Sequence, residues 1–287
     1  MLRPEYGDGM SGLLERLSPG DHACLVAGDE PSLTRSVAAY VRAGLRARHR
    51  VVYLGHGEQV AAELSSQGVD VRSARAAGRL QITPAAGEYV HGGGFDVDGT
   101  VDHWRGEAER ARAEGFRGFR AFGDMSWAAR TGRAGFMPLY EARVNRLFSE
   151  GFAMGVCLYD RRLFGMAEMR DIIRAHPCTI TAETSPDAVP LLRAVRIATP
   201  AGFGVRLEGE ADLSNRDALR TVLDHLAEEP GAVLTLDVAG LRFADSAAAR
   251  TLLRATGSGR RLRIVGCLPS LRRMLLLHGA GSDVEFV

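Results

Sequence analysis

The chain has 287 residues, of which 46% are hydrophobic and 25% are charged, and its formal net charge is +1. This length allows two domains of ordinary size, and the composition is that of a globular protein rather than of a disordered chain. A nearly neutral charge gives no electrostatic reason to expect nucleic acid or a membrane surface as a partner. All 36 basic residues are arginine, which excludes a phosphate-loop lysine and a Schiff-base lysine.

Four cysteines lie far apart and form no C-x-x-C pair, so a disulfide framework is not expected. The first residues lack the charged-then-apolar pattern of a signal peptide, and no apolar run approaches about 18 residues. We therefore expect a cytoplasmic protein that makes no membrane contact.

Strand-like and helix-like patterns alternate through the first 180 residues. Short apolar strands are expected at 22–27, 51–54, 80–82, 119–122 and 153–159. Amphipathic helices are expected at 12–17, 32–48, 58–66, 98–114, 136–150 and 165–175. This alternation predicts a parallel sheet covered by helices, with the carboxyl ends of the strands at one edge.

Polar or aromatic residues follow three of these strands, at 28–32, 123–127 and 159–160. Ligands of open α/β sheets bind at this edge, and Trp and Tyr offer an apolar face with a polar handle. We therefore expect a pocket for a small organic ligand, while a strand edge capped by aromatic packing stays open as the alternative. The candidate lining residues are His22, Asp124, Trp127, Glu141, Tyr159 and Asp160.

The order strand, glycine loop, helix resembles the core of RecA/KaiC-like ATPases, whose phosphate loop needs Gly-Lys-Ser/Thr. Here the loop at 28–32 reads GDEPS, with two acids where phosphates would lie and no lysine. The glycine tract at 91–94 also lacks a lysine, and no G-x-S-x-G nucleophile elbow occurs. The phosphate loop is therefore degenerate, and we expect neither an enzyme nor a bound cofactor.

A soft-metal or haem site is the other chemistry that the first part of the chain offers. Its donors would be His22, Cys24, Cys157 and His176, which adjacent strands of a parallel sheet can bring together. Their spacing is not that of a zinc module, and a buried free cysteine usually acts as a small hydrophobe. The favoured interpretation therefore assigns no metal.

Polar, proline-containing sequence at 181–190 separates the first part from a second one. A hairpin is expected at 191–199 and 204–209, followed by a helix at 217–227, a strand at 234–238 and a strand at 262–266. Between these strands, Asp245-Ser246 precedes an apolar helical run. The Ser246 hydroxyl can cap this helix, or it can carry a phosphate of about −1.5 to −2 charges near its positive end.

From about residue 189 onward the chain resembles a STAS domain of the anti-sigma-factor-antagonist type. The similar features are GEADLSN at 209–215, the strand–Asp245-Ser246–helix unit, the late strand and the closing helix PSLRRMLLLHG. The resemblance implies that Ser246 is phosphorylated by an anti-sigma factor with serine-kinase activity, and dephosphorylated by a PP2C-type phosphatase. It implies a partner surface at Asp212, Ser214, Asp245, Ser246, Ala247 and Arg250. The family usually has a glycine soon after the serine, where this chain has AAAR at 247–250.

The first part resembles the MEDS family of sensory domains, which are proposed to sense small organic molecules. The similar features are H-x-C at 22–24, VVY at 51–53, GDM-x-W at 123–127, YE at 140–141, C-x-YD at 157–160 and HP at 176–177. We therefore expect a MEDS-like sensor at 1–183, a linker at 184–189 and a STAS domain at 190–287, both domains being α/β. The predicted function is partner switching, with no nucleic acid involved and a dimer as one candidate assembly. The alternatives are a metal- or haem-dependent sensor, and a non-phosphorylated scaffold with a degenerate nucleotide-binding domain.

Overall fold

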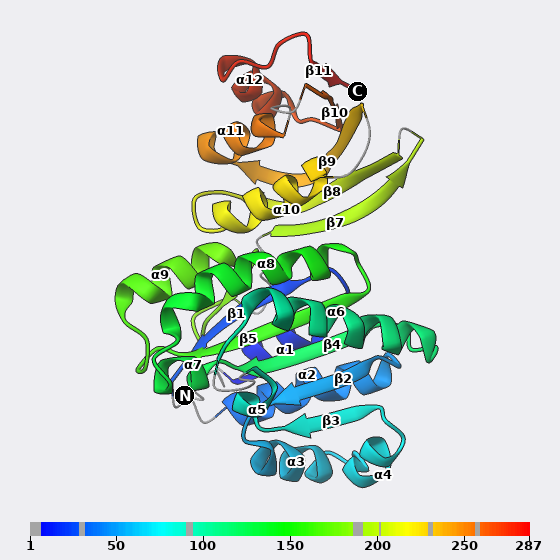
Figure 1. The fold of residues 1–287 in the computed structure, drawn as a ribbon, viewed down its shortest axis with the longest axis vertical. Helices are drawn as coiled ribbons and strands as arrows, with labels where there is room; N and C mark the ends of the chain where they lie inside the picture. The colour runs from blue at the N-terminus through cyan, green and yellow to red at the C-terminus, as the bar shows by residue number, and fades with distance from the viewer. Residues whose placement is uncertain are drawn as a thin grey trace, which may run out of the picture.

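In the computed structural model the chain forms two α/β units, one above the other in Figure 1. The structure describes residues 7–28, 32–89, 94–185, 192–200, 202–228, 232–255 and 259–287. The acidic loop at 29–31, most of the glycine tract at 91–94 and most of the linker at 184–189 therefore lie outside the described residues.

A six-stranded parallel sheet forms the centre of the first unit, in the order β3-β2-β4-β5-β1-β6. Its strands are β1 (His22–Ala27), β2 (Arg50–Leu54), β3 (Leu80–Thr83), β4 (Phe119–Asp124), β5 (Ala153–Asp160) and β6 (Cys178–Ile180). The first strand thus lies beside the fifth, because β1 pairs with β5 on one side and with β6 on the other.

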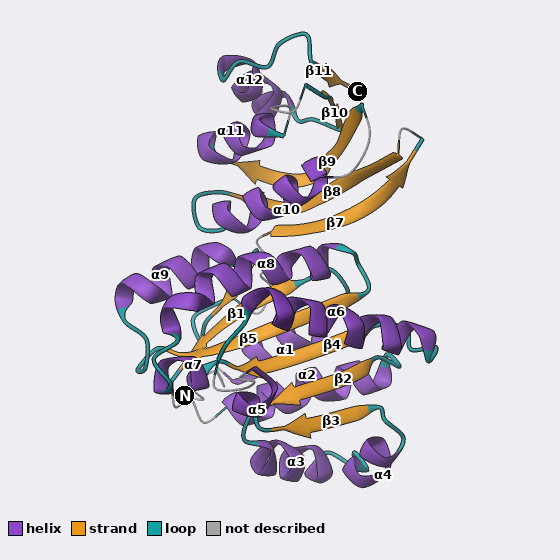
Figure 2. Cartoon of the chain, viewed as in Figure 1, coloured by secondary structure: helices purple, strands orange, loops and turns teal. Residues whose placement is uncertain are grey.

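Helices cover both faces of this sheet (Figure 2). One face packs on α1 (Gly7–Arg16), α2 (Leu33–Arg46), α3 (Gly57–Ser66) and α4 (Val71–Ala76). The other packs on α5 (Ala85–Tyr89), α6 (Val97–Ala113), α7 (Ser126–Arg130), α8 (Met137–Ser149) and α9 (Met166–Ala175), with the 3-10 helix η1 (Ala134–Phe136) before α8. Each face carries its own buried apolar core, so the strands are covered on both sides as parallel strands require.

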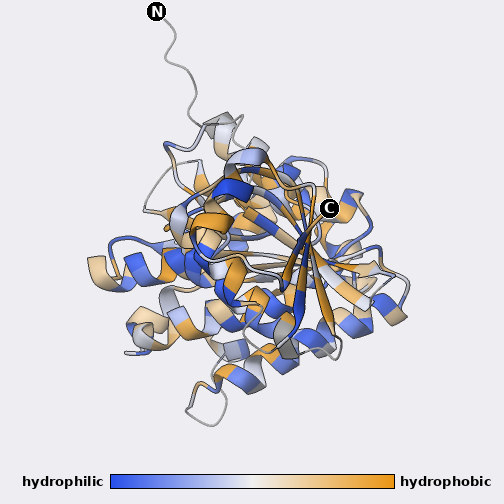
Figure 3. Cartoon of the chain, turned by 90° about the horizontal axis from the view of Figure 1, so that it is seen from above, coloured by the Kyte–Doolittle hydropathy of each residue, from blue (hydrophilic) through white to orange (hydrophobic). Residues whose placement is uncertain are grey.

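The second unit has a five-stranded mixed sheet in the order β11-β10-β9-β8-β7. Its strands are β7 (Leu192–Thr199), β8 (Gly202–Ala211), β9 (Val233–Ala244), β10 (Arg261–Val265) and β11 (Val284–Phe286). Its helices are α10 (Arg216–Glu228), α11 (Ser246–Arg254) and α12 (Pro269–Leu277). In Figure 3 apolar colour gathers along the strands, whereas the helices alternate between hydrophobic and hydrophilic stretches.

The α/β class of both units is confirmed, and most of the expected elements lie within a few residues of their predicted bounds. The predicted strand at 234–238 is longer, because β9 continues to Ala244 beside β8. Several short elements were not predicted, namely α4, α5, α7, β6 and β11. They have between three and six residues, too few to display a helical or strand period in the sequence.

Candidate functional site

The loop between β9 and α11 places Ser246 at the surface. Asp245 caps the helix, because its Oδ1 accepts a hydrogen bond of 2.7 Å from the amide of Ala248. Ser246 is then the first residue of α11 and is exposed, with its Oγ 2.6 Å from Nε2 of His278. The hydroxyl of Ser246 is therefore not required as a helix cap.

The loop after β8 lies next to this one, because Ala211 and Ala244 are paired in the parallel register of β8 and β9. The amide of Asp245 donates to the carbonyl of Ala211 over 3.0 Å. Asp212 accepts from the amide and the hydroxyl of Ser214, at 2.7 and 2.5 Å, so its carboxylate closes its own loop. The two loops meet at one end of the sheet, as the STAS resemblance implies.

Exposed apolar side chains flank these two loops. Leu213, beside Asp212, is 47% exposed, and Phe243, just before Asp245, is 51% exposed. Leu277, which precedes His278, is 80% exposed. Large apolar residues at a surface that also carries polar groups are typical of a protein-binding site.

A buried polar cluster lies in the first unit, inside the sheet face that α8 and α9 cover. Oε2 of Glu141 lies 3.2 Å from Nε2 of His22, 3.3 Å from Nε2 of His176 and 3.3 Å from Sγ of Cys157. Nε2 of His22 is also 3.5 Å from Sγ of Cys157. These four donor atoms lie within 4.8 Å of one another, and all four residues are buried.

Distant parts of the chain build this cluster. His22 begins β1 and Cys157 lies on the adjacent β5, while Glu141 is on α8 and His176 directly follows α9. His22 pairs with Gly155, where a side chain would collide with the ring of Phe148. That ring instead packs 4.6 Å from the ring of His22 and closes the cluster on one side.

A second set of contacts fixes the orientation of these side chains. Nδ1 of His22 lies 2.7 Å from Oδ1 of Asn145, whose Nδ2 donates to a backbone carbonyl over 2.7 Å. Nδ1 of His176 lies 2.8 Å from the carbonyl of Ile172, and the hydroxyl of Tyr159 donates to Oε1 of Glu141. Each imidazole is thus held by one ring nitrogen and points the other at Oε2 of Glu141.

Burial and the contacts within the cluster together decide its charge. Burial lowers the pKa of His22, and repulsion from His176 lowers it further, so His22 favours the neutral imidazole. Burial raises the pKa of the Cys157 thiol well above its usual value, and the nearby Glu141 carboxylate adds to this effect. Burial raises the pKa of Glu141 as well, but the interactions of its carboxylate with His176 and His22 outweigh burial and keep the pKa below its usual range. Glu141 is therefore an anion in an apolar interior.

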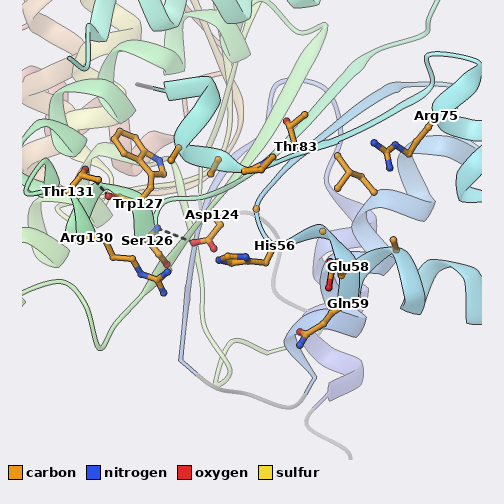
Figure 4. Close-up of a pocket in the computed structure, with 17 residues that line it drawn as sticks. His56, Glu58, Gln59, Arg75, Thr83, Asp124, Ser126, Trp127, Arg130 and Thr131 are labelled. Carbon is orange, nitrogen blue, oxygen red and sulfur yellow. Dashed lines mark hydrogen bonds between the residues drawn. The ribbon is translucent and has the colours of Figure 1, made fainter. Parts of the chain in front are cut away.

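A separate open cleft lies at the carboxyl ends of β2, β3 and β4, with a volume of about 1090 Å³ (Figure 4). Asp124 and Trp127 line it, together with cationic side chains such as Arg75 and Arg130. Asp124 accepts from the amide of Ser126 over 3.0 Å and so holds the start of α7. The cleft lies at the edge of the sheet that the sequence predicts for ligands.

The structure divides the six residues predicted for one ligand pocket. Asp124 and Trp127 lie at the open cleft, whereas His22, Glu141 and Tyr159 belong to the buried cluster. Asp160 is at the end of β5 and pairs with Arg162 at 2.8 Å. Of the predicted soft donors, Cys24 is buried in register with Cys157, but it is not one of the four clustered residues.

A family model for MEDS, the MEthanogen/methylotroph, DcmR Sensory domain, matches residues 21–177, more than half of the chain. The chain belongs to the MEDS family. A second model, of an Mlab, STAS domain, matches residues 197–284, so a MEDS domain is followed by a STAS domain as predicted. No curated protein matches the chain. Among the described residues, no helix is both long and apolar enough to cross a membrane.

The STAS domain is docked on the MEDS domain beside the buried cluster. Helix α10 and strand β7 pack on α8 (Figure 1). Arg193 of β7 reaches the carboxylate of Asp21, the residue before His22, at 2.6 and 2.7 Å. Asn215 donates to the carbonyl of Pro177, the residue after His176, over 3.4 Å.

Asn215 also joins this junction to the loop of Asp212. Its Oδ1 accepts from the amide of Asp212 at 3.0 Å, and its Nδ2 donates to the carbonyl of Glu210 at 2.9 Å. One buried side chain therefore contacts both the end of the MEDS domain and the loop beside Ser246.

Sequence reasoning missed Asn145, Arg193 and His278, and it gave Asn215 as the end of the STAS-like segment at 209–215, not as a contact with the MEDS domain. A signal existed for Asn145, which lies one helical turn after Glu141 on the same face of an amphipathic helix, where two polar residues interrupt apolar ones. Arg193, His278 and the contact of Asn215 with Pro177 carry no such signal, because the partners lie on distant elements or in the other domain.

Proposed function

We propose that this protein is an anti-sigma-factor antagonist that works by partner switching and has no catalytic activity of its own. In this proposal the unmodified STAS domain binds an anti-sigma factor, and phosphorylation of Ser246 by that partner weakens the complex. The observation that carries the proposal is the exposed Ser246 hydroxyl at the start of α11, next to the capping Asp245.

The position of Ser246 on its helix supports this proposal. Ser246 lies in the first turn of α11, where the helix dipole favours a negative charge by about 0.3–1 kcal/mol. The ring of His278 adds a hydrogen-bonding group within 2.6 Å of the hydroxyl. A phosphate would therefore change the charge of the surface without unfolding the domain, as a reversible switch requires.

The surroundings of Ser246 support a protein partner. The loops of Asp212, Ser214 and Asp245 lie at one end of the sheet, with exposed Leu213, Phe243 and Leu277 around them. A phosphate introduced into such an apolar interface would be desolvated on binding, which opposes association. Ala247 and the exposed Arg250 continue the same surface along α11.

In this proposal the MEDS domain receives the signal that controls the STAS domain. We propose that a small organic ligand binds in the open cleft, where Trp127 offers an apolar face and Asp124 lies at the end of β4. A ligand can shift the STAS output only if it favours one arrangement of the two domains. The contacts of Arg193 and Asn215 at the junction supply a physical connection for such coupling.

The test uses the purified full chain, ATP and each anti-sigma serine kinase encoded in the same genome, with phosphate located by mass spectrometry. We expect phosphate on Ser246 with one kinase, and loss of binding to that kinase in Ser246→Asp but not in Ser246→Ala. Ser270→Asp is the matched control, because Ser270 is an exposed serine in the first turn of another helix.

Equal loss of binding in Ser246→Asp and Ser270→Asp would mean that added charge acts anywhere on the domain, and would refute a switch at Ser246. Binding to an anti-sigma factor that is unaffected by Ser246→Asp, with no phosphate found, would instead favour a non-phosphorylated scaffold. The alanines at 247–249, where the STAS family usually has a glycine, favour that second function.

A further inference from the structure

In the buried cluster of the MEDS domain, the Nε2 atoms of His22 and His176 both face the carboxylate oxygen Oε2 of Glu141. The carbonyl of Ile172 can only accept, so Nδ1 of His176 carries a hydrogen. Asn145 uses its Nδ2 to donate to a carbonyl, so its Oδ1 faces His22 and Nδ1 of His22 also carries a hydrogen. In the neutral imidazoles, both Nε2 atoms are then lone-pair acceptors.

With both imidazoles neutral, three acceptors converge, since both Nε2 atoms lie 3.2–3.3 Å from Oε2 of Glu141. Nε2 of His176 makes no aligned hydrogen bond with any described residue, although it is fully buried. An orphaned polar atom in a protein interior is unfavourable, and acceptor lone pairs that face an anion repel each other. A positive charge among these three atoms, carried by a proton or by a metal ion, removes this repulsion.

The spacing of the four donor atoms fits a tetrahedral metal ion. Zinc bonds of about 2.0–2.3 Å to N, O and S give tetrahedral edges of roughly 3.3–3.6 Å. Four of the six edges here measure 3.2, 3.3, 3.3 and 3.5 Å, and no pair exceeds 4.8 Å.

The charges also balance. A divalent ion with one thiolate, one carboxylate and two neutral imidazoles is electrically neutral, which suits a site without solvent contact. On the outer sides of the ligands, Nδ1 of His22 donates to Asn145, Nδ1 of His176 donates to the carbonyl of Ile172, and Tyr159 donates to Glu141. Hydrogen bonds of this kind orient and tune metal-bound histidine and carboxylate.

We propose that His22, Glu141, Cys157 and His176 bind a divalent transition-metal ion, with Zn²⁺ as the preferred ion. All four positions are filled by protein, so the site is closed and structural or regulatory rather than catalytic. The site lies between the two junction contacts, because Asp21 and Pro177 are the chain neighbours of His22 and His176. The proposal stands independently of phosphorylation at Ser246.

The experiment uses the purified full chain with any affinity tag removed. Metal content is measured after dialysis, and the chelator-treated chain is then titrated with Co²⁺ alone. We expect one zinc ion per chain, and with Co²⁺ the intense ligand-field bands of a tetrahedral site together with a thiolate-to-cobalt charge-transfer band. The wild-type spectrum requires no variant, so the test does not depend on whether a variant folds.

Two cysteine variants identify the sulfur ligand. Cys157→Ser should remove the charge-transfer band, whereas Cys24→Ser should retain it, because Cys24 is an equally buried free cysteine paired in register with Cys157. A folded wild-type chain that binds neither zinc in stoichiometric amount nor Co²⁺ with a thiolate band would overturn the proposal. Loss of the band in Cys24→Ser and not in Cys157→Ser would overturn the assignment of the ligands.

Discussion

Replacing Arg193 by alanine tests whether the ion pair between Arg193, on strand β7 of the STAS domain, and Asp21 stabilises the MEDS domain. The Arg193 guanidinium donates to both carboxylate oxygens of Asp21, at 2.6 and 2.7 Å, and to the hydroxyl of Ser18 at 2.5 Å. Asp21 is only 2% exposed, so the variant leaves a buried carboxylate with fewer partners. The pKa of Arg193 is raised by its hydrogen bonds to Asp21, in accord with a strong interaction.

The magnitude follows from what remains after the substitution. Hydrogen bonds to charged groups contribute about 1.5–3 kcal/mol each, and loss of one partner of a fully buried ion pair costs about 3–5 kcal/mol. The amide of Ser18 still donates to Asp21 over 2.8 Å, and Arg193 is itself 26% exposed in its side chain. We therefore expect the free energy of unfolding of the MEDS domain to fall by about 2–3 kcal/mol.

Urea unfolding followed by tryptophan fluorescence measures this effect selectively, because both tryptophans, Trp104 and Trp127, lie in the MEDS domain. The midpoint should fall by roughly 1 M, given m-values of a few kcal/mol per M. Arg206→Ala is the matched control, since Arg206 pairs with Asp237 at 2.8 Å inside the STAS domain and is half exposed. It should leave the fluorescence midpoint unchanged, and equal midpoints for the two variants would refute coupling through Asp21.

Three further outcomes are expected. Asp245→Ala removes a helix cap and should lower the unfolding free energy of the STAS domain by about 1 kcal/mol. Ser246→Ala should change this free energy by less than about 0.5 kcal/mol. A larger effect of Ser246→Ala than of Asp245→Ala in calorimetry would contradict the capping role of Asp245. Burial, aided by Arg120, lowers the pKa of His49 to about 4, so the unfolded chain binds the extra proton between pH 6.5 and 4 and stability falls as the pH is lowered. His49→Gln should therefore reduce this loss of stability at low pH by up to about 1.4 kcal/mol per pH unit. Identical curves of stability against pH for the variant and the wild type would exclude a contribution of His49. Asn145→Ala should weaken zinc binding about 10–100-fold in competition with a chelator, and unchanged affinity would show that its contact with the cluster does not orient a ligand.

The prediction of the fold was successful where a pattern repeats over enough residues. Strand β1 lies at the predicted residues 22–27, and α9 begins within one residue of its predicted start. Strand β6, in contrast, has three residues and is a strand because β1 offers it an unpaired edge. Such an element depends on a neighbour supplied by a distant part of the chain, which the local sequence does not reveal.

The two candidate sites likewise differ in how far the local sequence predicted them. The Asp245-Ser246 loop could be found from the sequence, because a strand, a capping residue and an amphipathic helix follow one another along the chain. The sequence also supplied His22, Cys157 and His176 as donors, but it assigned Glu141 to a different pocket and Cys24 to the donor set.

Tertiary structure alone decided that assignment. Pairing of β1 with β5 brings His22 to Cys157, and the packing of α8 on that sheet face inserts Glu141 between His22 and His176. Cys24 is paired in register with Cys157, yet it is not one of the four residues whose donor atoms converge. Local sequence determines which face of an element is apolar, but the positions at which faces from four elements meet depend on their packing, and packing also placed the STAS domain beside this cluster.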